Sequence, residues 1–245
     1  MLNRTTQLIV DLINKATVYD VCIKSPLQPM PLLSDRVNNT VLLKREDLQP
    51  VYSFKLRGAY NKISQLSESE KQNGVIASSA GNHAQGVAYS AQKLGLSATI
   101  VMPVTTPDIK VDAVKRRGAN VVLYGDTYDE AYDHALEIAN QKKSIFIHPY
   151  DDPLVIAGQG TIAVELLADC PNMDYVFVAV GGGGLIAGVA AYIKSINPNI
   201  KVIGVEPDNS ACMTQALAAN ERIILNQVGI FADGVAVKQV GQEPF

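Results

Sequence analysis

Cysteine and histidine are scarce in this sequence, with three of each among 245 residues. The cysteines are odd in number and far apart, which argues against a disulfide framework and fits a reducing compartment. The histidines lack the spacing of metal ligands, so a zinc site is not expected and a structural role is the simpler interpretation for each. The six positions are Cys22, Cys170, Cys212, His83, His134 and His148.

Excess charge and long apolar runs are also missing. Charged residues make up 18% and the formal net charge is -3, which leaves no basic footprint for nucleic acid and no cationic face for anionic lipid. No apolar run approaches the roughly 20 residues that span a bilayer, and no secretory segment follows Met1. These absences predict a soluble cytoplasmic protein that has neither nucleic acid nor a membrane as partner.

The sequence does contain a regular alternation of short apolar runs and helical patterns. Several apolar runs, such as 176–180, are almost continuous, which is typical of strands buried on both faces. We expect strands at 41–43, 74–79, 98–102, 120–124, 145–147, 175–180 and 201–206. We expect helices at 56–66, 84–94, 109–117, 128–141, 154–167 and 185–196. Strand and helix alternating at this spacing predict an α/β fold with mostly parallel sheets.

Four consecutive glycines, Gly181 to Gly184, follow one predicted strand and precede a predicted helix. Without Cβ atoms, successive N–H groups can converge on one anion, and the helix N-terminus adds its positive dipole end. The run matches neither a dinucleotide-binding nor a Walker pattern, because Val189 and Ala190 follow Gly188. We therefore interpret it as a small phosphate cup; a turn that merely permits close packing is the alternative.

A second strand-to-helix turn contains Ser79, Ala80, Gly81, Asn82 and His83. Its hydroxyl, amide and backbone N–H groups are suited to a carboxylate by the same logic, although an ordinary helix cap is the simpler interpretation.

The helix expected at 56–66 begins beside two cations, Lys55 and Arg57. Cations at a helix N-terminus oppose the dipole and typically lose about 0.3–1 kcal/mol each. A bound anion would offset that cost, and apolar neighbours would lower the pKa of Lys55 and make its amine a better nucleophile. From the residues alone, two solvated surface cations are the simpler interpretation.

Together these segments resemble the fold-type II pyridoxal-phosphate enzymes, and among them the biosynthetic threonine deaminases. The resemblance runs from about Pro26 to the end of the chain, in family order. The matching stretches are KREDLQPVYSFKLRGAY, SSAGNHAQGVAYSAQKLG, VMPVTTPDIKVDAVKRRGA, DDPLVIAGQGTIAVELL, VGGGGLIAGVAA, VIGVEPDNSAC and FADGVAV.

The resemblance implies pyridoxal 5'-phosphate as cofactor and a role for each matching residue. Lys55 is expected to form the Schiff base with the cofactor, Phe54 to lie beside its ring, and Asn82 to bond the ring hydroxyl. The backbone of Gly181, Gly182, Gly183, Gly184 and Leu185 is expected to hold the phosphate. The substrate carboxylate is expected to lie among Ser79, Gly81, Asn82 and His83.

The implied reaction is elimination of water from L-threonine, which gives 2-oxobutanoate and ammonia as the first step of isoleucine biosynthesis. Lys55 is expected to remove the α-proton as general base. L-serine is expected to react similarly, and the enzyme to be a homo-oligomer.

Two positions depart from related enzymes. Serine racemases carry a serine at the position of Ala80, where it serves as the base on the opposite ring face, so Ala80 argues against racemisation. Relatives with a divalent cation use a carboxylate where this chain has Cys212, and a thiol is a poor substitute, so no metal is expected at Glu206.

The resemblance also predicts a division into domains. Residues 74–150 would form a small domain, and residues 1–73 and 151–245 an incomplete large domain, because the family's catalytic domain continues beyond FADGVAV. The part beyond the end would include the residue that meets the pyridine nitrogen. The fold would comprise two mostly parallel open sheets with flanking helices.

Three alternatives to a biosynthetic threonine deaminase follow from the sequence. A catabolic serine/threonine dehydratase of the same fold is the nearest. A truncated remnant that binds a ligand or partner without turnover is the second. A nucleotide-binding oxidoreductase is the third, and the absence of a dinucleotide pattern disfavours it.

Overall fold

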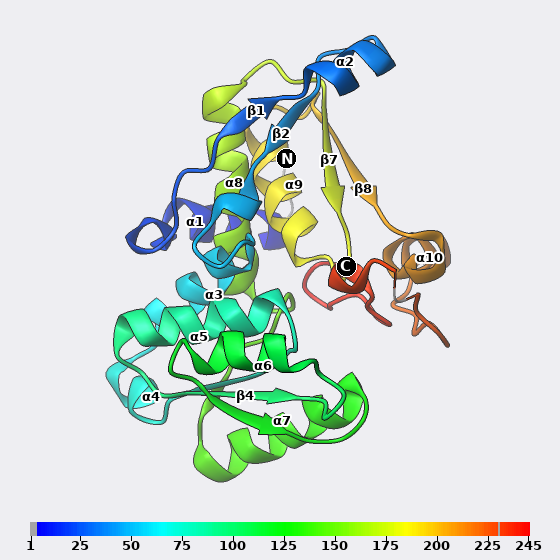
Figure 1. The fold of residues 1–245 in the computed structure, drawn as a ribbon. Helices are drawn as coiled ribbons and strands as arrows, with labels where there is room; N and C mark the ends of the chain where they lie inside the picture. Colours follow the sequence, from blue (N-terminus) through cyan, green and yellow to red (C-terminus); the bar gives the residue numbers. More distant parts are fainter. Residues whose placement is uncertain (1–3, 230) are drawn as a thin grey trace.

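A four-stranded parallel sheet forms one of the two main units of the computed structural model, which describes residues 4–229 and 231–245 (Figure 1). Its strand order is β5-β4-β3-β6. The strands are β3 (Val75–Ser78), β4 (Ala98–Met102), β5 (Asn120–Leu123) and β6 (Ile145–Phe146). Because all of them run in one direction, their carboxyl ends share one edge of the sheet, where α/β proteins bind ligands.

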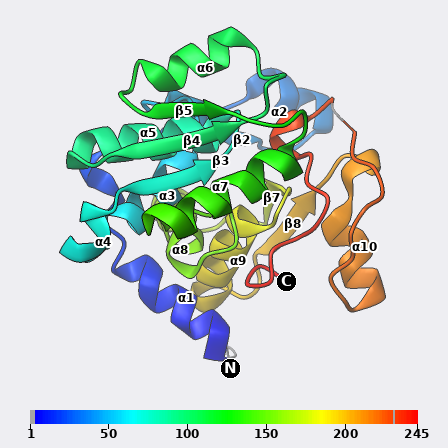
Figure 2. The ribbon, with the colours of Figure 1, turned by 90° about the horizontal axis from the view of Figure 1, so that it is seen from below.

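Helices cover both faces of this sheet. Apolar side chains of α3 (Lys55–Ser64), α5 (Asn82–Leu94) and α6 (Asp108–Lys115) pack on one face, and those of α7 (Tyr128–Lys142) pack on the other. In Figure 1, α5 and α6 lie above β4 and α7 lies below it, and Figure 2 shows β5, β4 and β3 side by side. Every residue of β3 is buried, as expected for a strand between two helical layers.

The second unit is built on two parallel strands, β7 (Tyr175–Ala179) and β8 (Lys201–Val205). One face packs against α8 (Pro153–Asp169) and α9 (Gly184–Ile196), and α1 (Arg4–Asn14) lies against these helices. The other face is open within the described residues, and Phe177 is 69% exposed there. The prediction that this strand is buried on both faces is therefore wrong for β7 in this structure.

Each predicted strand is present with both ends within one residue, and each predicted helix with both ends within two. The predicted α/β class is confirmed. Several short elements were not predicted: β1 (Leu27–Pro29), α2 (Pro31–Val37), α4 (Glu68–Gln72) and α10 (Cys212–Ala219). The predicted strand at 41–43 is β2 (Leu42–Lys44), and its antiparallel pairing with β1 was also not predicted.

The two units meet through helices that approach closely at glycine. A Cβ on Gly158 of α8 would lie 2.5 Å from the carbonyl oxygen of Arg57 and 2.6 Å from the Cα of Gly58 in α3. A Cβ on Gly188 of α9 would lie 2.4 Å from the carbonyl oxygen of Ile156 in α8. Because glycine has no Cβ, α3 can pack closely on α8, and α8 on α9. This close packing brings the first residues of α3 and of α9 into the same region.

The segment 231–245 lies where the two units meet, as its red ribbon in Figure 1 shows. Two exposed ion pairs, Lys110 with Asp233 and Lys238 with Asp129, join it to α6 and α7. The four-stranded sheet lies wholly inside the predicted small domain of residues 74–150. The domain boundaries themselves stay a prediction. Among the described helices, none combines the length and apolarity that crossing a bilayer requires.

Gly158→Ala tests the close approach of α3 and α8. The added methyl meets backbone atoms that cannot rotate away, so we expect the free energy of unfolding to fall by about 1–3 kcal/mol. Gly234→Ala is the matched control, because nothing lies within 4 Å of its Cβ position. Urea denaturation of both variants is the measurement, and equal stabilities would contradict the packing account.

Candidate functional site

The Lys55 amine is the central group of the candidate site. Lys55 begins α3, its side chain is half-buried, and its terminal amine is desolvated by the protein atoms around it. Nζ donates a hydrogen bond to the carbonyl oxygen of Pro149 at 2.9 Å, and it lies 5.5 Å from the ring centre of Phe54. Burial lowers the pKa of this amine to about 8, and no carboxylate of the described residues acts on it. A buried lysine without a counter-ion is costly to keep charged, so its neutral, nucleophilic form is populated at a lower pH than for an exposed lysine.

Arg57, two residues further along, has a different environment. Its side chain is fully buried, with ion pairs to Glu46 at 2.8 Å and to Glu165 at 2.6 Å. Its guanidinium also donates to Thr161 Oγ1 and the carbonyl oxygen of Ile23. The interpretation of Lys55 and Arg57 as surface cations is therefore wrong. Residues distant in sequence supply the carboxylates, which is why local reasoning missed them.

The start of α5 is the second component. Its N-cap is Gly81, and no side chain caps it, in contrast to α4 and α7, where Ser67 and Thr127 form capping boxes. The helix-cap interpretation of Ser79 and Asn82 is therefore wrong. Ser79 Oγ accepts a hydrogen bond from the N–H of Gly81, and Asn82 is exposed. The first N–H groups of α5 thus lack a side-chain cap, a situation that suits an anion.

His83 ties this turn to the sheet. Its ring is buried, and Nε2 lies 2.8 Å from the carbonyl oxygen of Ile147, at the end of β6. Because a carbonyl only accepts, Nε2 carries the proton and Nδ1 is an unprotonated acceptor without a partner in the described structure. Burial and the nearby Lys55 charge lower the pKa of His83 to about 3, so the ring is neutral. The expected structural role of His83 is thus compatible with a place beside Lys55.

The glycine loop is the third component. Gly183 has a φ of 95° and is the N-cap of α9, which no side chain caps. A Cβ on Gly182 would lie 2.3 Å from the Tyr150 ring, and one on Gly184 would lie 2.6 Å from the Tyr150 carbonyl oxygen. Only glycine fits at these two positions. The loop therefore presents backbone N–H groups at an uncapped helix start, as the phosphate-cup interpretation requires.

The segment 147–150, Ile-His-Pro-Tyr, connects all three components. Ile147 accepts from His83, Pro149 accepts from Lys55, and Tyr150 packs on the glycine loop. None of these residues was predicted from the sequence to be part of the site. Their position directly after a parallel strand was the available signal, because that edge is where ligands bind.

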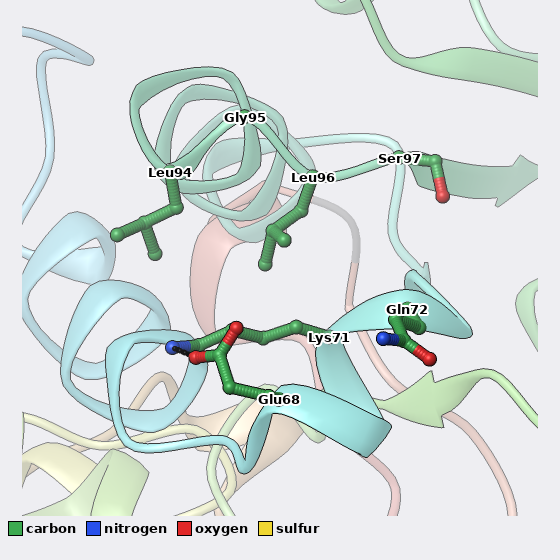
Figure 3. Close-up of a pocket in the computed structure, with 7 residues that line it drawn as sticks. All are labelled: Glu68, Lys71, Gln72, Leu94, Gly95, Leu96 and Ser97. Atoms are coloured by element: carbon green, nitrogen blue, oxygen red, sulfur yellow. Dashed lines mark hydrogen bonds and ion pairs between the residues drawn. The ribbon is translucent and has the colours of Figure 1, made fainter.

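Two surface hollows lie elsewhere and do not take part in this site. One is lined by α4 and the turn between α5 and β4, where Lys71 is paired with Glu68 (Figure 3). The other lies where β7 and β8 begin. Both flank the amino ends of parallel strands, opposite to the edge that carries Lys55 and the turns.

Glu206 and Cys212 serve local structure. Glu206 accepts from the N–H groups of Met213 and Thr214 and so caps α10. Cys212 is buried, and its Sγ lies 3.5 Å from the carbonyl oxygen of Gly181. Within residues 4–229 and 231–245, no three metal-ligating side chains form a cluster.

Comparison with known proteins finds a family model and curated relatives that match most of this chain. The family model described as "Pyridoxal-phosphate dependent enzyme" matches residues 18–245. The chain is 59% identical to the biosynthetic L-threonine dehydratase IlvA of Pasteurella multocida, over 93% of this chain and 44% of that protein. It therefore spans less than half the length of this curated relative.

Two solved structures share the fold. Threonine deaminase isoform 2 of Solanum lycopersicum superposes with a TM-score of 0.97 at 52% identity, covering 100% of this chain and 67% of that one. Maize serine racemase superposes with a TM-score of 0.93 at 32% identity, covering 96% of this chain and 72% of that one. The fold is thus shared by enzymes with different reactions.

Lys55→Met tests the burial of the amine in the cofactor-free protein. Folded Lys55 loses its proton near pH 8, whereas the unfolded chain holds it until about 10.5. Below pH 8 the folded protein bears the full cost of a buried charge, so the variant should be more stable there, by about 3 kcal/mol. The advantage should shrink as pH rises from 8 to 10.5. Unfolding curves across this range check the window, with the exposed Lys115→Met as control; a difference that stays constant with pH would contradict it.

Proposed function

The chain belongs to the pyridoxal-phosphate-dependent enzyme family, and we propose that its polypeptide deaminates L-threonine to 2-oxobutanoate and ammonia by elimination of water. The similarity to threonine dehydratases and deaminases supports this reaction, as does a site with one reactive amine and two anion-binding turns. The single observation that carries the proposal is the buried Lys55 amine, which has a carbonyl partner and no carboxylate.

The residues present fit pyridoxal phosphate. The cofactor needs an amine for its aldehyde and a cradle for its phosphate. Lys55 would hold the aldehyde carbon, and the N–H groups of Gly181 to Gly184 and Leu185 would hold the phosphate at the uncapped start of α9. Phe54 would lie beside the ring and Asn82 would bond the ring hydroxyl. When bound, the cofactor supplies an electron sink for the charge that remains after the α-proton leaves.

The substrate carboxylate would lie at the start of α5. Ser79, Gly81, Asn82 and His83 belong to the turn that leads into that helix, whose uncapped N–H groups and dipole favour an anion. The His83 ring donates to Ile147, so His83 would bind the carboxylate through its backbone N–H.

Lys55 would act as the base. A pKa near 8 leaves an appreciable neutral fraction at physiological pH, and a general base is most effective when its pKa lies near the working pH. Its enclosed amine would take the α-proton without competition from water. Ala80 offers no second base on the other face, which favours elimination over racemisation.

Three finer parts of the proposal rest on family resemblance. These are a role as the first step of isoleucine biosynthesis, L-serine as a second substrate, and a cytoplasmic homo-oligomer. Direct kinetics with both amino acids and a measurement of mass in solution address the last two.

Reductive trapping tests the proposed function. Pyridoxal phosphate added to the purified protein should give a visible absorption band, and borohydride reduction followed by peptide mapping should place the label on Lys55. Lys55→Ala should lose the band and at least 1,000-fold of the oxo-acid release from threonine, on the order of an essential nucleophile or base. Lys62→Ala, on the same helix but paired with Asp152, is the control. Label on another lysine, or none, would refute the site.

A further inference from the structure

Tyr150 joins the reactive lysine to the glycine loop, and no role follows for it from the proposed function on which this inference rests. Its ring covers Gly182, since a Cβ there would lie 2.3–2.4 Å from three ring carbons. Its neighbour Pro149 supplies the carbonyl that accepts from Lys55. The carbonyl that accepts from Lys55 therefore belongs to the residue directly before the one whose ring contacts the glycine loop.

The hydrogen-bond chemistry at Pro149 shows what this carbonyl does. A neutral amine has two N–H donors and one lone pair, whereas an ammonium group has three donors that all need acceptors. The described residues offer Nζ one acceptor, the Pro149 oxygen. A carbonyl cannot donate, so the lone pair stays unengaged by Pro149 and points away from it. The carbonyl therefore orients a neutral amine with its reactive electron pair free.

The backbone N–H groups that follow this carbonyl are already bound to another acceptor. The N–H groups of Tyr150 and Asp151 both donate to Nδ1 of His148, at 3.3 and 2.8 Å. Neither is therefore left to donate to the lone pair of Lys55. Burial lowers the pKa of His148 to about 4, which keeps Nδ1 free of a proton and able to accept both.

Tyr150 is held in place from several sides. Its ring packs edge-on against His148 with centroids 4.7 Å apart, and its hydroxyl donates to the carbonyl oxygen of Gln239 at 3.3 Å. With Gly182 beneath the ring, the side chain contacts both main units and the C-terminal segment. A residue fixed at so many points also fixes the carbonyl that precedes it.

We propose that Tyr150 is a positioning residue for Lys55: by packing on the glycine loop, it fixes the Pro149 carbonyl that orients the lysine amine. Tyr150 acts through Pro149 and takes no proton itself. Any displacement of the ring from Gly182 should therefore loosen the amine, even when Lys55 and the loop are chemically intact.

The first test uses the cofactor-free full-length protein and the rate at which an amine-reactive acylating reagent labels Lys55, read by peptide mass spectrometry. Tyr150→Ala should raise that rate by about tenfold, because local opening exposes the amine. Gly182→Ala should raise it as well, because the new methyl pushes the ring aside without creating space. Tyr150→Phe keeps the ring and should restore most of the protection.

The second test uses the cofactor-loaded full-length enzyme. Tyr150→Ala should lower kcat for threonine by about 10- to 100-fold with little change in KM, as expected for a misplaced base. The isotope effect on kcat with threonine deuterated at the α-carbon should rise, because proton removal becomes slower than the other steps. A purely structural defect would lower the folded fraction and leave the isotope effect unchanged.

A double variant tests whether the effects of Tyr150 and Gly182 depend on each other, and a variant at another aromatic residue serves as the control. In the Tyr150→Ala background, Gly182→Ala should add little to the labelling rate, because no ring remains to be displaced. Tyr124→Ala removes an aromatic ring that stacks on His134 and follows β5, at the opposite end of the strand order from β6, and should leave the labelling rate unchanged.

The outcomes separate this inference from the proposed function. Wild-type labelling rates in Tyr150→Ala and Gly182→Ala, or additive effects of the two changes, would overturn the positioning role. Failure of borohydride to trap the cofactor on Lys55 would instead overturn the proposed function, and the cofactor-free labelling rates would still decide the role of Tyr150.

Discussion

A lysine amine held inside the protein by one carbonyl, without a carboxylate, is the constraint on which the rest of this structure depends. Burying an ammonium group costs several kcal/mol unless it is paired, and the described residues give Lys55 no pair. Burial therefore shifts the equilibrium towards the neutral amine, which is populated near pH 8 instead of only near 10.5. A neutral amine in a dry cleft is a nucleophile and a base, so the same feature that weakens the fold makes the site reactive.

The scaffold around Lys55 shows how such a group is kept in place. Arg57, one half-turn further along α3, satisfies its guanidinium with two carboxylates, a hydroxyl and a carbonyl. Removing one partner of such a buried pair is strongly destabilising, so this cluster fixes the first turn of α3. Glycines then bring α3 against α8 and α8 against α9, which carries the glycine loop towards the lysine. The buried ion pairs of Arg57 and the close helix contacts at glycine therefore lie beside the reactive amine.

Much of this architecture was predictable because its signals are local. The spacing of apolar residues and the glycines at element ends predict strands β3 to β8 and helices α3 and α5 to α9. The observed ends of these elements lie within two residues of the predicted ends. The glycine loop at a helix start was also predictable, because four glycines between a strand and a helix are read from consecutive residues. At the second turn the residues alone favoured an ordinary helix cap, which the structure does not have. No feature of the residues next to Lys55 in the sequence identifies it as the reactive lysine. Physical reasoning on the sequence favoured a solvated Lys55, and only family resemblance selected it.

The failures have one physical cause, which is long-range contact. One carboxylate of Arg57 comes from residue 165 and the carbonyl of Lys55 comes from residue 149, so no short window around position 55 contains them. Glu46 is nearer in the sequence, but nothing local shows that its carboxylate pairs with Arg57. The exposed face of β7 was misjudged for a related reason. An apolar strand indicates that something covers it, but not which segment does, and within the described residues only one face is covered.

If the Lys55 amine and the glycine loop belong to one site, a single small molecule must be able to bridge them. A crystal structure of the borohydride-reduced, cofactor-treated full-length protein decides this. We expect continuous density from Lys55 Nζ to the cofactor, with the phosphate on the N–H groups that follow Gly181. Density that joins the cofactor to Lys55 while its phosphate lies away from this loop, or a cofactor bound to another lysine, would contradict it.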